Sequence, residues 1–447
     1  MAPRTSEIEP VELQIQPSTE NDEHLTAEPE SNVTEEQTMS RLVLCRLLAI
    51  GLSFFVTGLN DGSLGALIPY IIRSYNISTG LAAIMYLTTF IGWIIAFFTN
   101  SLLTQYVSYA SMLVLGAILQ LLAHALRSWL PPLPFFAINF TLFGLGKAYQ
   151  DIFSNGYVGG VKSAHRWLGF IHACYAGGSL VGPFVATGIA SAPGNRWWLF
   201  YLFPTGLSVV NVIGLATTFR ALLGVRWQRR WRGPAADIMQ ASAADSSAAK
   251  AAVKNMKAAL SFANVWKLSV FYFFYLEVLV TANGWVVEYL VSVRGGQLSK
   301  VGYVSAGFNG GTFLGRLLLA EPTHRLGERL MLLIYCGICI GLHLMFWLIP
   351  NIIAASVAIS VFGFFLGPFF AAGVSVASRL FSDNIKSSAL GFVLISGQMG
   401  GNAFPAITGL VAGRVGVQVL QPILVGLLGA TAVSWSLVPR KESIHRE

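Results

Sequence analysis

Four acidic side chains interrupt the long apolar stretches of this chain: Asp61, Asp151, Glu277 and Glu288. The other acidic residues fall in the first 40 positions or in segments that have the composition of loops and of a C-terminal tail. A carboxyl group inside a membrane is costly unless it faces a cavity or a partner, and it therefore marks a candidate proton or solute site. Chemistry is expected at these four positions.

Asp151 has the most informative neighbours. Lys147, Asp151 and Asn155 follow one another at intervals of four residues and share one helix face, with Gln150 beside it. A desolvated carboxyl group holds its proton more strongly, so Asp151 could load and release a proton as a cavity opens. The alternative is a silent Lys147–Asp151 ion pair within one helix, unless a solute or another acid engages Lys147.

Asp61 follows Asn60 in a glycine-rich stretch, in which Gly58 and Gly62 permit a bend or a close helix approach. An amide beside a carboxylate suits recognition of solute hydroxyl groups, and it also suits a proton site. The alternative is an interhelical hydrogen bond that only locks two helices together.

Glu277 precedes Asn283 and Trp285 in an aromatic-rich stretch. The acid is a third candidate for proton coupling, and the amide and indole are candidates for solute binding. Aromatic residues at this spacing also suit a core or a lipid-facing surface. Glu288 lies nearer the end of the stretch, close to Arg294, which predicts an outer salt bridge or a solvated rim.

Isolated polar residues in other apolar stretches are further candidates for solute contact. His172 could titrate near neutral pH, although a histidine satisfied within the core is the alternative. Gln398 and Asn402 are four residues apart and share a helix face. The remaining candidate is Asn309.

The composition predicts the elements that position these residues. Hydrophobic residues make up 54% of the 447 residues and charged residues only 11%, against about 25% in soluble proteins. Apolar runs long enough to cross a bilayer recur from Leu42 onward, so we expect an all-α membrane protein with twelve transmembrane helices. The expected spans are 43–72, 79–99, 108–127, 133–160, 167–190, 197–219, 267–292, 300–320, 329–349, 352–380, 387–412 and 415–438.

The chain divides into two halves of six spans each. A Gly-x4-Pro pattern at Gly178 recurs at Gly400, which indicates two pseudo-symmetric six-helix bundles. The expected parts are a disordered acidic tail (1–40), an N-terminal bundle (41–219), a basic linker (220–266), a C-terminal bundle (267–438) and a short tail (439–447).

Most Lys and Arg residues fall on the side that carries both termini and the linker, which predicts that this side is cytoplasmic. Arg127, the last residue of the expected span 108–127, is counted on the opposite side. The sequon at Asn76 would be glycosylated on that side, and we expect the protein in the plasma membrane.

Other functional classes find little support in the sequence. The histidines show no metal-ligand spacing, and there is no phosphate-binding loop followed by a soluble ATPase domain. We expect no enzyme activity, no cofactor and no metal. The basic balance suits anionic lipid rather than nucleic acid, and a monomer is expected.

The loop expected after the eighth span supplies a charged motif, Gly315-Arg316 followed by Arg325-Leu-Gly327-Glu328-Arg329. This motif is similar to the second copy of the charged loop of the major facilitator superfamily, which the chain resembles over about residues 42–438. This resemblance implies a gating role for Arg316, Arg325, Glu328 and Arg329. The first copy, expected near residues 99–109, lacks charge.

Several motifs resemble the fucose-permease-like branch and its fungal members: Gly58-Leu-Asn-Asp61-Gly62, Gln150-Asp151-x3-Asn155-x-Tyr157-Val158, His172-x2-Tyr175-x2-Gly178 and Gly284-Trp285. The resemblance implies a role for Asp151 in proton coupling. The expected function is alternating-access transport of a small, sugar-like solute together with protons. The alternative is an antiporter that exports a fungal secondary metabolite, with the same acids carrying the protons.

Overall fold

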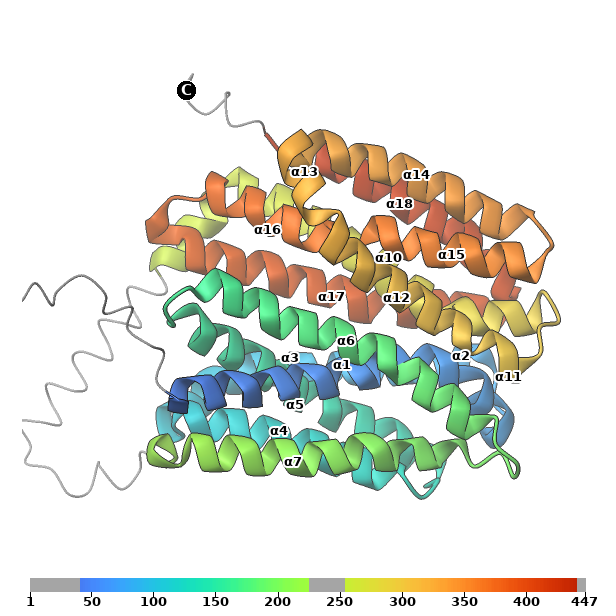
Figure 1. The fold of residues 1–447 in the computed structure, drawn as a ribbon, viewed down its shortest axis with the longest axis horizontal. Helices are drawn as coiled ribbons and strands as arrows, with labels where there is room; N and C mark the ends of the chain where they lie inside the picture. The colour runs from blue at the N-terminus through green and yellow to red at the C-terminus, as the bar shows by residue number, and fades with distance from the viewer. Residues whose placement is uncertain (1–40, 225–253, 440–447) are drawn as a thin grey trace, which may run out of the picture. The chain divides into compact units, whose positions relative to one another are not determined.

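The computed structural model describes residues 41–224 and 254–439, and all the regular elements in these ranges are helices (Figure 1). The predicted N-terminal tail, the middle of the predicted linker and the last eight residues lie outside the described ranges.

The first half of the chain forms one group of helices (Figure 1). Its helices are α1 (Arg41–Tyr75), α2 (Thr79–Ala82), α3 (Ile84–Tyr106), α4 (Tyr109–Arg127), α5 (Leu133–Gly159), α6 (Ala164–Ala190), η1 (Trp197–Tyr201), α7 (Leu202–Thr218) and η2 (Arg220–Leu222).

The second half forms the other group, drawn from yellow to red in Figure 1. Its helices are α10 (Ala263–Ser292), α11 (Leu298–Val301), α12 (Tyr303–Leu318), α13 (Ala320–Leu326), α14 (Glu328–Leu348), α15 (Ile352–Leu366), α16 (Phe369–Leu380), α17 (Asp383–Val415), η3 (Val417–Val419) and α18 (Leu420–Ser436).

Length and hydropathy mark nine helical segments of the described residues as able to cross a membrane. Three longer or more polar elements complete the set of twelve: α5, α11 with α12, and α17. The predicted fold of two six-helix bundles is therefore confirmed. The three additional elements carry polar side chains, which lower their hydropathy and, as shown below, line a cavity.

Helix starts follow local chemistry at several positions. The hydroxyl oxygens of Ser78 and Ser108 accept hydrogen bonds from the backbone N–H groups of Leu81 and Ser111 at the starts of α2 and α4. Proline precedes α5 at Pro132, where the missing N–H costs nothing.

Close packing of α1 against α6 fixes the first part of the site. A Cβ atom added at Gly58 would collide with the carbonyl oxygen of Tyr175, and one at Gly178 with that of Phe55. Only glycine allows the two backbones to approach this closely. The polar side chains of α1 and α6 are thereby brought within hydrogen-bonding distance.

The two bundles pack together mainly in the half of the helices remote from the linker, which we call the far half. Ser305 of α12 donates to the carbonyl oxygen of Gly62 in α1 at 3.3 Å, and Tyr86 of α3 packs on Trp285 of α10 with ring centroids 5.8 Å apart. Phe184 of α6 similarly contacts Tyr303, at 5.9 Å. The helix ends that join the linker form the other half, called the linker end.

Arg127 ends α4, which agrees with the expected span 108–127, but its side chain is fully buried, because its guanidinium is stabilised by aromatic rings as described below. Two other expected placements are wrong. Gly315 and Arg316 lie within α12, which continues to Leu318, rather than in the following loop.

Glu288 is neither solvated nor bound to Arg294. It is 5% exposed and accepts a hydrogen bond from Ser292 at 2.5 Å, one turn along α10. Arg294 instead donates to the backbone carbonyl groups of Phe346 and Trp347, because the end of α14 lies within its reach.

Candidate solute and proton site

A cavity of about 160 Å³ lies between the two bundles. Helices α1, α5 and α6 supply one wall, and α10, α12 and α17 supply much of the other. Most of the polar candidates predicted from the sequence line it: Asn60, Asp61, Lys147, Gln150, Asp151, Asn155, His172, Asn283, Asn309, Gln398 and Asn402.

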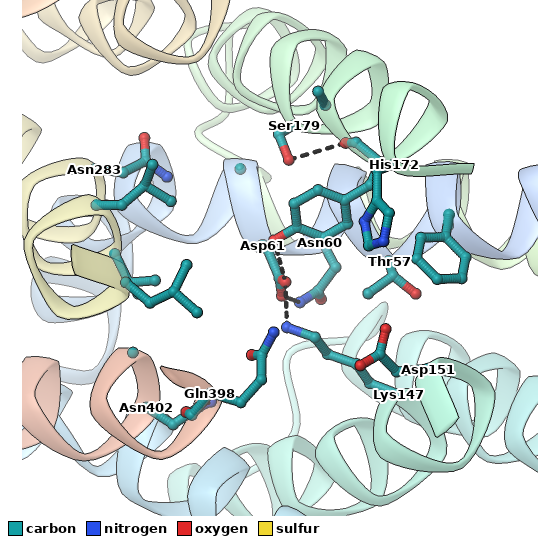
Figure 2. Close-up of a pocket in the computed structure, with 18 of the residues that line it drawn as sticks. Thr57, Asn60, Asp61, Lys147, Asp151, His172, Ser179, Asn283, Gln398 and Asn402 are labelled. Atoms are coloured by element: carbon teal, nitrogen blue, oxygen red, sulfur yellow. Dashed lines mark hydrogen bonds and ion pairs between the residues drawn. The ribbon is translucent and has the colours of Figure 1, made fainter. Parts of the chain in front are cut away.

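Lys147 is bound to an acid on another helix. Its Nζ lies 2.6 Å from Oδ2 of Asp61 on α1, and the Tyr175 hydroxyl of α6 donates to the same oxygen at 2.9 Å (Figure 2). The two charged side chains are 12% and 24% exposed, so the pair is shielded from bulk water. It ties α1, α5 and α6 together at the cavity wall.

A buried arginine extends this network. Arg127, at the end of α4, donates from Nη1 to Oδ1 of Asn60 at 3.2 Å, and Asn60 donates to Oδ1 of Asp61 at 3.4 Å. Its guanidinium carbon lies 4.3 Å from the ring centroid of Phe140 and 4.7 Å from that of Tyr201. Aromatic faces and one amide thus compensate a cation that is fully removed from solvent.

Asp151 has a different environment from Asp61. Its Oδ1 accepts a hydrogen bond from Asn155 Nδ2 at 3.1 Å, one turn along α5. Among the described residues, no cation lies within ion-pair distance of Asp151, because Lys147 turns toward Asp61. The carboxyl group is therefore held at the cavity wall without a direct ion pair, while Lys147 remains within electrostatic range of it.

Gln150 is more enclosed than its neighbour. It is 2% exposed, accepts from Gln120 at 2.7 Å and donates to the Ser53 hydroxyl at 3.4 Å. Because its amide is largely satisfied by α1 and α4, it orders the wall behind Asp151.

Amide groups dominate the opposite wall. Oδ1 of Asn283 accepts from Ser305 at 2.8 Å and from Asn309 at 2.7 Å. On α17, Asn402 donates to the carbonyl oxygen of Gln398 at 2.6 Å, and both side chains point toward the cavity (Figure 2). These groups offer donors and acceptors but no charge, which suits hydroxyl recognition.

Two predicted site residues lie elsewhere. Glu277 is fully buried, outside the cavity lining, and neither carboxyl oxygen has a hydrogen-bond partner among the described residues. Trp285 is 1% exposed and donates to the carbonyl oxygen of Pro405 at 3.2 Å, so it packs α10 against α17. The periodicity of α10 was compatible with either side of the helix, and packing decided which side faces inward.

Other cavity residues were not among the predicted site residues. Tyr175 belongs to a quoted motif, but its spacing gave no sign that its hydroxyl would reach Asp61. Thr57 and Ser179 are small hydroxyl residues on α1 and α6 that join the lining.

Arg316 is a predicted site residue with a gating role, and the structure places it on the cavity wall.

His172 lies at the contact between the bundles. Its ring packs edge-on against Phe54 of α1 at 5.3 Å and lies 5.3 Å from the ring of Phe370 on α16. Phe370 also lines the cavity, so these rings narrow the space between the two walls.

The other three predicted gating residues lie together at the linker end of the C-terminal bundle. Glu328 Oε1 accepts from His324 at 3.0 Å and from Ser375 at 3.1 Å, and it lies 2.6 Å from Nη2 of Arg379. Arg325 pairs with Glu321 at 2.5 Å on the surface.

Arg329 connects the same region to the last helix. Its Nη2 donates to the carbonyl oxygen of Ser436 at 2.5 Å, and Trp435 donates to the Arg329 carbonyl oxygen at 3.1 Å. Together these bonds connect α13, α14, α16 and α18.

A family model described as Major Facilitator Superfamily matches residues 50–366 of this chain. The chain belongs to the major facilitator superfamily. It is accordingly a multi-pass membrane transporter and not an enzyme. The transporters of this superfamily bind small solutes and are typically monomeric.

One curated relative is Bypass of stop codon protein 6 of Saccharomyces cerevisiae. It is 23% identical over 425 residues, which cover 91% of this chain and 84% of the yeast protein.

Solved structures share the superfamily fold. A D-xylose–proton symporter aligns with a TM-score of 0.68 at 12% identity, covering 89% of this chain and 98% of that one. A bacterial homologue of the human lysosomal transporter Spinster, in an inward-facing conformation, aligns with a TM-score of 0.63 at 14% identity, covering 90% and 98%.

Proposed function

We propose that this transporter carries a small hydroxylated organic solute by alternating access and couples its movement to protons. The proposal rests on the different partners of two acidic side chains that line one cavity. Asp61 holds Lys147 at 2.6 Å, and Asp151 keeps only an amide partner on its own helix.

Asp151 is the proposed proton carrier. A carboxyl group without a direct ion pair gains or loses its proton according to how much water reaches it. Its side chain is partly exposed in the present conformation, so proton exchange with the cavity is possible. When the walls close, desolvation favours the protonated form, which couples the proton to the conformational change.

Asp61 has a structural role in this proposal. Its carboxylate is already engaged by Lys147, Tyr175 and Asn60. It orients the wall and prevents Lys147 from neutralising Asp151.

Solute hydroxyl groups would meet the amides on both walls. Asn155 of α5 is available on one side, and Asn309, Gln398 and Asn402 are available on the other. Since each bundle supplies part of this set, bound solute would bridge the bundles and favour their closure.

The packed far half and the cavity between the bundles suit one end state of an alternating-access cycle. With both termini in the cytoplasm of a plasma-membrane protein, this state faces inward. The cluster around Glu328 would then keep the cytoplasmic ends of α13, α14 and α16 together while the bundles rock.

The likeness to the solved structure of a D-xylose–proton symporter supports the symport form of this proposal. A glycine series in α6, Gly169-x8-Gly178-x3-Gly182-Pro183, supports the second candidate, an antiporter that exports a secondary metabolite, because its spacing resembles the motif of superfamily antiporters. The same cavity and the same acid serve both directions.

The internal pH of proteoliposomes distinguishes the symporter from the antiporter. The purified chain would be reconstituted and a panel of sugars, polyols and sugar acids added outside. Internal acidification with one solute is expected for symport, and alkalinisation for exchange. Solute uptake without any pH change would contradict proton coupling in either form.

A further inference from the structure

Arg316 is a cation on the cavity wall without an acidic partner. It lies in the last turn of α12, and an arginine side chain remains charged at all physiological pH values. Among the acidic side chains that the structure describes, none lies within ion-pair distance of it. Its Nε atom is buried and has no hydrogen-bond partner among the described residues.

The acidic side chains of the cavity and of the linker end are not paired with Arg316. Asp61 binds Lys147 and Tyr175, Asp151 has the amide of Asn155 as its partner, and Glu328 binds Arg379. The C-terminal wall therefore presents to the cavity one positive charge without an acidic partner.

Arg316 also faces the other bundle. It lies within electrostatic range of His172 and Tyr175 on α6, and within side-chain hydrogen-bonding range of the fully buried Tyr275 on α10. None of these three side chains is an acid, so they leave the positive charge of the guanidinium without an anionic partner. An anion that pairs with Arg316 would come from the contents of the cavity.

We propose that Arg316 binds the carboxylate of the transported solute, so that the substrate is a hydroxylated organic acid. This inference rests on the proposed function and defines its substrate class. The planar guanidinium fork matches a carboxylate and donates two parallel hydrogen bonds to it. Hydroxyl groups of the same solute would reach Asn309 and Gln398.

Closure of the cavity gives this pairing a role in transport. Removing an unpaired guanidinium from water is strongly unfavourable, whereas an ion pair with good hydrogen bonds offsets much of that cost. The empty carrier would therefore resist closure, and the loaded carrier would close. Arg316 would select for an acid both when the solute binds and during the conformational change.

Matched pairs of solutes test the assignment. Thermal unfolding of the purified full chain would be followed with D-galacturonate against D-galactose, D-gluconate against sorbitol, and inorganic phosphate. At least one acid should bind tenfold or more tightly than its neutral partner, since a charge-assisted hydrogen bond contributes at least about that factor. Arg316→Gln should abolish the difference.

Arg414 provides the control, because it is an exposed arginine at the end of α17, and Arg414→Gln should leave the difference intact. If Arg316→Gln does not fold, Arg316→Lys must still lower the ratio of acid to neutral affinity, because lysine lacks the fork.

Three results would overturn the proposal: neutral partners that bind as tightly as the acids, no stabilisation by any acid, or acid binding that survives Arg316→Gln. Stabilisation by inorganic phosphate equal to that by the best acid would also overturn it. A transporter that is not coupled to protons would still bind the acid more tightly than its neutral partner. A proton-coupled transporter of neutral sugars would not. Failure of this inference is therefore distinguishable from failure of proton coupling.

Discussion

Lys147 bonds Asp61 across two helices, at 2.6 Å, rather than Asp151 one turn away on its own helix. This choice gives the two cavity acids different environments. One carboxylate becomes part of a fixed network, and the other remains available for proton exchange.

Breaking the Asp61–Lys147 pair should damage the wall and the coupling together. Asp61→Asn leaves Lys147 part-buried without its partner, which should cost up to about 3 kcal/mol of folding stability. It also frees Lys147 to pair with Asp151. We expect a lower unfolding temperature and loss of proton-coupled uptake.

Tyr175→Phe is the matched control for that variant, since it removes one donor to Asp61 and keeps the ring and the ion pair. Its cost should be about 1 kcal/mol, with coupling retained. Equal effects of the two variants would show that the ion pair has no special role.

Arg127 should contribute to the stability of the N-terminal bundle. Arg127→Met leaves the oxygen of Asn60 unsatisfied and removes the cation from the faces of Phe140 and Tyr201. We expect a loss of about 1 to 3 kcal/mol, seen as a lower unfolding temperature.

Arg127→Lys should recover little of the stability that Arg127→Met loses, because an ammonium group cannot stack on the rings and reach Asn60 at once. The exposed Arg414→Gln serves as the reference for loss of one positive charge. Full stability of Arg127→Met would refute the network described for α4.

The cluster of Glu328, His324, Ser375 and Arg379 at the linker end should affect the equilibrium between the two end states of the transport cycle. Glu328→Gln removes the charge that binds Arg379 and weakens the bond to His324. We expect the rate at which a cysteine at the linker end is labelled to change several-fold. We also expect the transport rate to fall.

Glu321→Gln is the comparison for the linker-end cluster. Its pair with Arg325 is exposed on both sides, and surface ion pairs contribute only about 0–1 kcal/mol. It should leave labelling and transport unchanged. The gating assignment fails if the two glutamate variants behave alike.

Glycosylation tests the orientation. Asn76 is exposed in the turn after α1, with a positive φ of 50°, and is sterically open to a glycan. Expression in a eukaryotic host should give a glycosidase-sensitive band that Asn76→Gln removes. The sequence holds a second sequon, Asn32-Val-Thr34, which lies outside the described residues and on the side predicted to be cytoplasmic. A band that depends on Asn32 instead would reverse the predicted topology.

The sequence predicted the fold well because apolar run length reports membrane helices directly. It predicted the cavity residues of α5 and α17 because four-residue spacing determines which side chains share a face. It could not predict that Lys147 would reach Asp61, since that pair depends on how closely α1 packs against its neighbours.

The placement of charged side chains within the bundles was the weakest part of the prediction. Arg127 ends an apolar run, which predicts the outer end of a span, and nothing local shows that Phe140 and Tyr201 would enclose it. Arg316 was assigned to a loop because its motif resembles a charged loop, whereas α12 continues past it. Glu277 shows the same limit, since helix periodicity does not tell which side of α10 faces the cavity.

The most direct test of the proton-carrier assignment compares two fluxes in Asp151→Asn. Proteoliposomes would be assayed for solute-driven change of internal pH and, side by side, for exchange of labelled solute against unlabelled solute. The asparagine keeps the shape and the contact with Asn155, so exchange should persist while the pH change disappears. Proton-coupled accumulation at the wild-type level in this variant would contradict the account.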